Sequence, residues 1–338
     1  MPLPLLEKRP RWRGFGARRG GRVDERLYPF RSRWFRRGNL ALHYVDEGAG
    51  APIVLIHGNP TWSFYYREVI KALAPEYRVV APDHMGCGLS SRPSDRQFRY
   101  TLASHVENLE ALLDELGLTE NVTLVMHDWG GMIGMACACR RPERIARIVL
   151  LNTAAFLMPP GKRLPWRLRV VKSVPLLPSL FVRGGNAFAG AATYMAVCRP
   201  LSAAVRRGYL DPYDSWRRRI ATLRFVQDIP LSPRDASYGL AAWVDRSIGQ
   251  FRDRPMLICW GEQDFVFDGK ILAEWRRRFP GAEVHTFAGA GHYLLEDAGE
   301  QVIAHLRDFL ARYPLDRDTR GPRAADVVES PVTEAEAR

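Results

Sequence analysis

The stretch Asn121–Gly134 constrains the fold of this chain more than any other, because it changes from one kind of secondary structure to another within a few residues. Val122–Met126 is a mostly apolar run of the kind found in strands that are buried on both faces. His127–Gly131 interrupts this run with an aspartate and two glycines, and a helical pattern then continues through Met135. The sequence therefore predicts a strand, a tight turn and a helix in direct succession, with Asp128 at the turn.

Strand and helix patterns alternate along most of the chain. Periodic apolar spacing predicts helices at residues 61–74, 101–117, 271–278 and 299–312. Short apolar or alternating runs predict strands at Leu40–Val45, Ile53–Ile56, Arg78–Ala81, Arg147–Leu151, Met256–Trp260 and Glu283–Phe287. Strands that alternate with helices form a mostly parallel sheet covered by helices on both faces, so the predicted fold class is α/β.

The alternation stops between Ala155 and about Asp253, where proline, arginine and aromatic residues are frequent. A structureless loop of that length is unusual inside a compact domain, so we interpret residues 156–253 as a helical cap inserted over the site. Residues 28–155 and 254–314 then form the core. Residues 1–27 are predicted to be a basic, flexible arm and residues 315–338 a disordered tail.

The positive charge of the chain is unevenly distributed. The 338 residues carry a formal net charge of +12, and residues 1–37 hold twelve lysine or arginine residues against three acidic ones. The arm is a candidate for contact with anionic lipid, nucleic acid or an acidic protein, and a solvated extension is the alternative. The rest of the chain is only mildly basic, which argues against a nucleic-acid binder.

Composition and cysteine usage favour a cytoplasmic protein. No apolar run reaches the roughly 18 residues of a membrane-spanning helix, and the N-terminus lacks the apolar segment of a secretory signal. The five cysteines show no spacing typical of disulfides or zinc ligands, so reduced thiols are expected.

Three residues at predicted strand ends follow the order nucleophile, acid and histidine: Asp128, Asp264 and His292. A carboxylate nucleophile indicates an alkyl-ester intermediate and argues against the acyl transfer that a serine performs. Asp264 is expected to orient His292 and to stabilise its cationic form. Glu262 is an alternative acid, but its spacing from the preceding strand is less suitable.

A second group of residues is suited to a leaving anion. Asn59 follows the strand Ile53–Ile56, and Trp129 directly follows Asp128. An amide and an indole N–H directed at one point would stabilise a developing halide or carboxylate. The alternatives are that Asn59 forms a turn before Pro60 and that Trp129 packs beneath the cap.

Several motifs resemble those of haloalkane dehalogenases, which are α/β-hydrolases: HGNPTWSFYYR at 57–67, PDHMGCGLS at 82–90, HDWGG at 127–131 and GAGHY at 289–293. The acid at Asp264 and the pair Asn59 and Trp129 resemble the third dehalogenase subgroup. Three further motifs resemble the β-lactone decarboxylases of bacterial long-chain olefin biosynthesis: NTAAF at 152–156, RFVQDIPL at 224–231 and FVFDGKILAEWRRRFP at 265–280.

The resemblance covers roughly residues 28–314 and departs from the usual pattern at Met126, where many hydrolases carry a small residue. It implies an α/β-hydrolase fold with an eight-stranded sheet and an inserted helical cap. It also implies that a cis-3,4-dialkyl-oxetan-2-one is converted to a cis-alkene and CO2 without a cofactor or metal ion. Assembly with other enzymes of the pathway is expected, and the arm is a candidate for peripheral membrane contact.

A substrate with two alkyl chains needs an apolar tunnel. Cap residues suited to line it are Trp166, Leu168, Phe181, Phe188 and Met195, and the alternative is that they form an ordinary cap core.

Three other functions fit parts of the pattern. A haloalkane dehalogenase would use the same site through an alkyl-aspartate ester. An epoxide hydrolase would use cap tyrosines as acids, for which the candidates are Tyr194, Tyr209, Tyr213 and Tyr238. A non-catalytic assembly subunit would not need the complete set of Asp128, Asp264 and His292.

Overall fold

The computed structural model describes residues 23–174 and 177–315. The predicted arm at 1–27 lies outside the described residues except for its last five positions. The predicted tail at 315–338 lies outside them except for Leu315.

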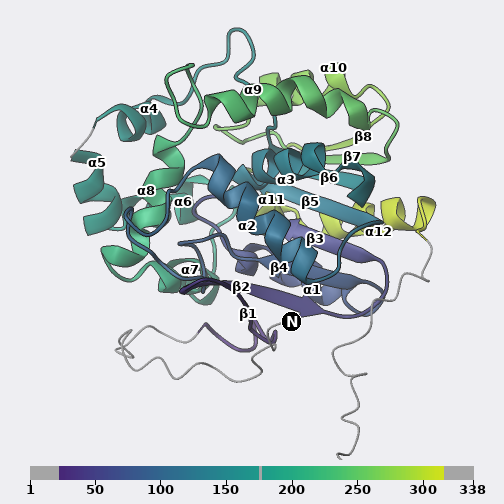
Figure 1. Cartoon of the computed structure of the whole chain (residues 1–338), viewed down its shortest axis with the longest axis horizontal. Helices are drawn as coiled ribbons and strands as arrows, with labels where there is room; N and C mark the ends of the chain where they lie inside the picture. The colour runs from purple at the N-terminus through teal and green to yellow at the C-terminus, as the bar shows by residue number, and fades with distance from the viewer. Residues whose placement is uncertain (1–22, 175–176, 316–338) are drawn as a thin grey trace, which may run out of the picture.

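A single eight-stranded sheet with the order β1-β2-β4-β3-β5-β6-β7-β8 forms the centre of the molecule (Figure 1). β2 pairs antiparallel with β1 and with β4, and every other neighbouring pair is parallel. The strands are β1 (Arg33–Arg37), β2 (Leu40–Glu47), β3 (Pro52–Ile56), β4 (Arg78–Pro82), β5 (Val122–Asp128), β6 (Ile145–Thr153), β7 (Met256–Gly261) and β8 (Glu283–Phe287). The predicted mostly parallel, eight-stranded α/β fold is confirmed.

Two apolar layers, one on each face of the sheet, hold the helices. Along β3, Val54 and Ile56 point into one layer, and Ile53 and Leu55 point into the other. The first layer packs against α2 (Leu102–Glu115), α3 (Trp129–Arg140), α9 (Tyr238–Ser247) and α10 (Gly269–Arg278). The second packs against α1 (Arg67–Leu73), α11 (Leu294–Asp297) and α12 (Gly299–Arg312).

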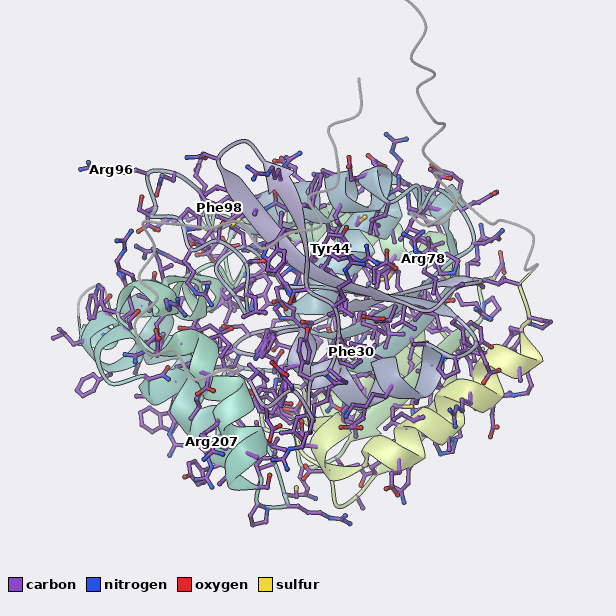
Figure 2. All side chains as sticks on the ribbon, turned by 90° about the horizontal axis from the view of Figure 1, so that it is seen from below. Phe30, Tyr44, Arg78, Arg96, Phe98 and Arg207 are labelled. Atoms are coloured by element: carbon purple, nitrogen blue, oxygen red, sulfur yellow. The ribbon has the colours of Figure 1, made fainter. Side chains whose placement is uncertain are left out.

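Helices between β6 and β7 extend beyond the sheet and cover the carboxyl end of β5 (Figure 1). In chain order they are α4 (Trp166–Ser173), α5 (Leu177–Ser179), η3 (Leu180–Gly184), α6 (Ala187–Met195), α7 (Ala203–Leu210), η4 (Asp211–Tyr213), η5 (Arg217–Arg219) and α8 (Ile220–Gln227). Figure 2 shows them at one end of the molecule, near the labelled Arg207, with α12 at the other end. α9 also lies in the segment predicted as cap, but its Ala241 and Val244 pack in the sheet layer beside α3.

β1 was not among the predicted strands. Its sequence, RWFRR, is dominated by arginine, which is uncommon in a buried strand. It lies at the edge of the sheet, where charged side chains remain in solvent, and Gly38 with φ +61° turns it into β2. No helix among the described residues is long and apolar enough to span a bilayer.

Gly134 explains how the turn after β5 tolerates the bulky Met126. A Cβ at position 134 would lie 2.5 Å from the Met126 Sδ and 2.8 Å from the Ile56 Cδ1. Met126 is fully buried beneath α3. The missing side chain of Gly134 therefore provides the space that Met126 occupies.

We expect Gly134→Ala to lower the free energy of unfolding by about 1–3 kcal/mol, because it overpacks this contact. Met126→Ala removes the side chain that this Cβ would meet first, so Gly134→Ala should lower the free energy of unfolding by less in the Met126→Ala protein. Guanidinium unfolding of the four proteins measures the coupling, which we expect to reach about 1 kcal/mol. Additive losses would contradict the packing explanation.

His105 on α2 is a buried histidine held in its neutral form. It is 2% exposed, and neither ring nitrogen has a hydrogen-bond partner among the described residues. Its ring stacks on Phe225 of α8 with the centroids 4.5 Å apart. Burial lowers the pKa of His105 to about 3, and the nearby His57 adds to the decrease. Unfolding restores the ordinary pKa near 6.5, so acid favours the unfolded chain.

His105→Phe should therefore make stability less sensitive to acid. In the wild type, the contribution of neutral His105 to the free energy of unfolding is present above about pH 6.5 and is lost as the pH falls toward 3. Between pH 7 and pH 5 the wild type should lose about 2 kcal/mol more than the variant. Urea unfolding of both proteins at the two pH values measures this difference, and equal losses would show that His105 is not the linked group.

Candidate active site

Asp128 occupies a strained turn between β5 and α3. Its φ of 51° is uncommon for a residue with a side chain, and such strain is typical of functional turns. Gly58 lies against it: a Cβ at position 58 would be 2.2 Å from the Asp128 Cβ and from its Oδ1. The loop after β3 can therefore approach closely enough for the Asn59 backbone N–H to donate to the Asp128 Oδ1 at 2.8 Å.

His292 stands between two carboxylates. Its Nε2 is 3.5 Å from the Asp128 Oδ2, and its Nδ1 is 2.8 Å from the Asp264 Oδ2. All three residues are buried. The backbone N–H groups of Val266 and Phe267 donate to the other Asp264 oxygen at 2.7 and 3.0 Å. The structure thus brings together the three residues that the sequence placed at strand ends.

The charges of this group depend on one another. Burial raises the pKa of Asp128, although His292 and the backbone N–H groups of Asn59 and Trp129 oppose that rise. Burial alone would lower the pKa of His292, but Asp264, aided by Asp128, raises it above its ordinary value. The imidazolium is therefore favoured when both carboxylates are ionised.

Asn152 holds Asp264 in place and was not predicted as a site residue. Its Nδ2 donates to the Asp264 Oδ2 and to the Gly261 carbonyl, both at 3.0 Å, and its Oδ1 accepts the Gly261 N–H at 2.8 Å. The available signal was its position directly after the predicted strand Arg147–Leu151, at the same edge of the sheet as Asp128.

Asn59 and Trp129 line one cavity with Asp128 and His292. The Asn59 Nδ2 donates to the Thr222 carbonyl at 3.1 Å, which occupies one of its two hydrogens. The Asn59 Oδ1 is buried and has no hydrogen-bond partner among the described residues. The sequence did not anticipate that the Asn59 backbone binds Asp128 itself.

The cavity has a volume of about 710 Å³ and is mainly apolar. The structure places all five predicted tunnel residues along it: Trp166, Leu168, Phe181, Phe188 and Met195. Three of them are largely exposed, with exposed fractions of 69% for Trp166, 61% for Phe181 and 41% for Met195. These three side chains therefore lie at a mouth of the cavity and do not form a closed cap core.

The alternative acid and the alternative cap tyrosines named from the sequence do not line the cavity. Glu262 is exposed, whereas Asp264 is buried against His292. None of the four candidate cap tyrosines lines the cavity: Tyr194, Tyr209, Tyr213 and Tyr238. Within residues 23–174 and 177–315, no cluster of three or more histidine, cysteine or acidic side chains is arranged to hold a metal ion.

Known proteins resemble this chain over most of its length. Residues 51–299 match the family model of the alpha/beta hydrolase fold. The cis-3-alkyl-4-alkyloxetan-2-one decarboxylase of Shewanella oneidensis is 51% identical over 285 residues, which cover 84% of this chain and 89% of the relative. The protein of the same name from Xanthomonas campestris is 44% identical, covering 82% of this chain and 95% of the relative.

Haloalkane dehalogenases are more distant relatives. Haloalkane dehalogenase 2 of Mycobacterium tuberculosis is 36% identical, with 83% of this chain and 95% of the relative covered. The solved structure of haloalkane dehalogenase DatA from Agrobacterium tumefaciens matches with a TM-score of 0.75 at 26% identity, covering 84% of this chain and 97% of that one. The resemblance predicted from the motifs is confirmed, and the chain belongs to the α/β-hydrolase family that includes the cis-3-alkyl-4-alkyloxetan-2-one decarboxylases and the haloalkane dehalogenases.

Proposed function

We propose that this protein converts cis-3,4-dialkyl β-lactones to cis-alkenes and CO2 in long-chain olefin biosynthesis, with Asp128 as the nucleophile. The observation that carries the proposal is a buried carboxylate at an apolar cavity of about 710 Å³. Such a cavity suits a ligand with little polarity beyond one small ring. The names of the two relatives at 51% and 44% identity support the same substrate class.

In the first step an Asp128 oxygen attacks C4, the alkyl-bearing ring carbon that is bonded to the ring oxygen. The bond from that carbon to the ring oxygen breaks, the carbon inverts, and a β-carboxylate is released while an alkyl ester forms on Asp128. The second amide hydrogen of Asn59 and the indole N–H of Trp129 are proposed to stabilise this new carboxylate.

In the second step the new carboxylate leaves as CO2. Its carbon–carbon bond supplies the electron pair of the alkene, and the ester carbon–oxygen bond breaks to restore the Asp128 carboxylate. Inversion followed by anti elimination gives a cis-alkene from a cis-lactone. Neither water nor an external proton is consumed, so the step balances with the residues present.

His292 and Asp264 are proposed to set the electrostatics of this cycle. An imidazolium 3.5 Å from Asp128 stabilises it as a leaving carboxylate in the second step. Asp264 in turn stabilises the imidazolium. The alternative first step is attack at the lactone carbonyl, which gives an acyl anhydride. That attack would not invert the alkyl-bearing ring carbon.

Haloalkane dehalogenase activity is the second candidate, and the haloalkane dehalogenases among the relatives favour it. In that reaction His292 would activate water to hydrolyse the ester. Epoxide hydrolysis has less support, because none of the four cap tyrosines named above lines the cavity.

The remaining expectations concern where the protein works. We propose a cytoplasmic enzyme that assembles with the enzymes supplying its β-lactone, with the arm at 1–27 as a candidate for contact with those partners or with a membrane. The twelve basic residues within positions 1–37 support an anionic binding partner.

Gas chromatography of products from a cis-dialkyl β-lactone tests the activity. The wild type should release one cis-alkene for each lactone consumed, and Asp128→Asn should lower kcat by at least about a thousandfold. Glu262→Gln is a matched control that should retain kcat within about twofold, because this exposed acid lies outside the cavity. Halide release from a dihaloalkane, with no alkene from the lactone, would assign the dehalogenase reaction instead.

Asn152→Ala tests the support of Asp264. We expect kcat to fall roughly tenfold, since the loss of one buried hydrogen bond to a charged group costs about 1.5 kcal/mol or more. KM should stay unchanged, because Asn152 does not line the cavity. Asn108→Ala is the control. Asn108 is also a buried asparagine, but it lies on α2, so its replacement should leave kcat and KM unchanged. A rise in KM with an unaltered kcat would show that Asn152 does not act through Asp264.

A further inference from the structure

The cap carries an exposed apolar surface around the mouth of the cavity. Nine of the twelve large hydrophobic side chains that are exposed in the described residues lie between positions 166 and 231. We define the cap surface by six of them: Trp166, Val170, Leu180, Phe181, Tyr194 and Met195. They come from α4, η3 and α6; Figure 1 shows α4 and α6 at the left of the molecule, and η3 directly follows α5 on the same side.

α4 contains no fully buried residue, although its Leu168 and Val171 line the cavity. Its sequence is WRLRVVKS, and none of its eight residues is buried. Packing within this chain does not explain the exposure of Trp166 and Val170, because burial of apolar surface is the main source of helix stability in proteins. Exposed apolar patches of this kind mark sites of protein or membrane contact.

The first part of the cap, residues 156–210, carries only basic charged side chains. Residues 156–210 contain nine lysine or arginine residues and no aspartate or glutamate. Arg167 and Arg169 on α4 are exposed, and so is Arg163, three residues before that helix. The cap therefore adds a second basic region to the arm, which a whole-chain charge does not reveal.

The cations and the apolar side chains are in contact with one another. The Arg167 guanidinium lies 5.3 Å from the centroid of the Trp166 ring, and its Nη1 is 3.7 Å from the Met195 Sδ. The Arg206 guanidinium lies 4.9 Å from the Tyr194 ring centroid. Amphipathic aromatic rings beside arginine are typical of surfaces that lie at the boundary between lipid headgroups and acyl chains.

The geometry points to an anionic lipid bilayer as the occupant of the cap surface. The charge requires an anionic partner, and the exposed tryptophan, leucine and phenylalanine require an apolar one. A bilayer with anionic headgroups supplies both. A purely acidic protein surface would account for the arginines but not for the apolar side chains at the cavity mouth. In this orientation the cavity opens toward the acyl chains, so an apolar ligand enters or leaves without crossing water.

Vesicle binding by the full-length chain tests the inference. The probes are vesicles of phosphatidylcholine alone and of an equimolar mixture of phosphatidylcholine and phosphatidylglycerol. Binding should be tighter to the mixed vesicles and should weaken as salt is added. Hydrogen exchange should show that these vesicles protect the amides of α4, η3 and α6 but not those of α10 or α12.

Two triple variants separate the apolar and charged contributions. Trp166→Gln/Leu180→Gln/Phe181→Gln and Arg163→Gln/Arg167→Gln/Arg169→Gln should each weaken binding to mixed vesicles at least about tenfold. The arm is unchanged in both, so any difference from wild type reports the cap.

The matched control removes the same charge from another part of the surface. Arg141, Arg246 and Arg276 are exposed on the core, outside α4 to α8. Their joint replacement by glutamine should alter vesicle affinity by no more than about twofold. Because binding is measured without turnover, this result does not depend on whether the proposed lactone reaction is correct.

Two outcomes would overturn the inference. In the first, both cap variants bind vesicles like the wild type, or the amides of α4, η3 and α6 remain unprotected. In the second, soluble poly-glutamate protects these amides as well as vesicles do and the apolar triple variant has no effect, which would assign the cap surface to an acidic protein.

Discussion

The carboxylate of Asp128 is buried beside an apolar cavity, and its neighbours oppose the rise in pKa that this burial causes. An unpaired carboxylate in such surroundings takes up a proton, which would abolish its nucleophilicity. The Asn59 backbone N–H at 2.8 Å and His292 at 3.5 Å favour the ionised form. The positive φ of Asp128 and the absence of a side chain at Gly58 allow both contacts at once.

In the proposed reaction, the same arrangement determines which group leaves from the substrate. A serine at this turn would transfer an acyl group, whereas a carboxylate forms an ester that an adjacent anion can expel. In the proposed route, the mainly apolar lining of the cavity would offer water few hydrogen-bond partners beside that ester, which would favour fragmentation over hydrolysis. Asn152 and two backbone N–H groups hold the Asp264 carboxylate in place beside His292. Asp264 raises the pKa of His292, which favours its cationic form.

The sequence predicted the elements whose signals are local. The apolar runs identified β2 to β8, and the change of pattern at Asp128 located the turn. β1 was missed because an edge strand can be rich in arginine, which removes the apolar signal. The role of Asn152 could not be predicted from local patterns, because its partners Gly261 and Asp264 are 109 and 112 positions away. The roles of Asp128, Asp264 and His292 remain predictions, although the structure brings these residues together.

Turnover in 18O-labelled water tests most directly whether Asp128 is restored by fragmentation. The measurement is the mass of the peptide that contains Asp128 after many turnovers of a cis-dialkyl β-lactone. We expect no label to enter this carboxylate, because water does not attack the ester in the proposed route. Incorporation of 18O into Asp128 during turnover would mean that the ester is hydrolysed, and it would contradict the proposed route.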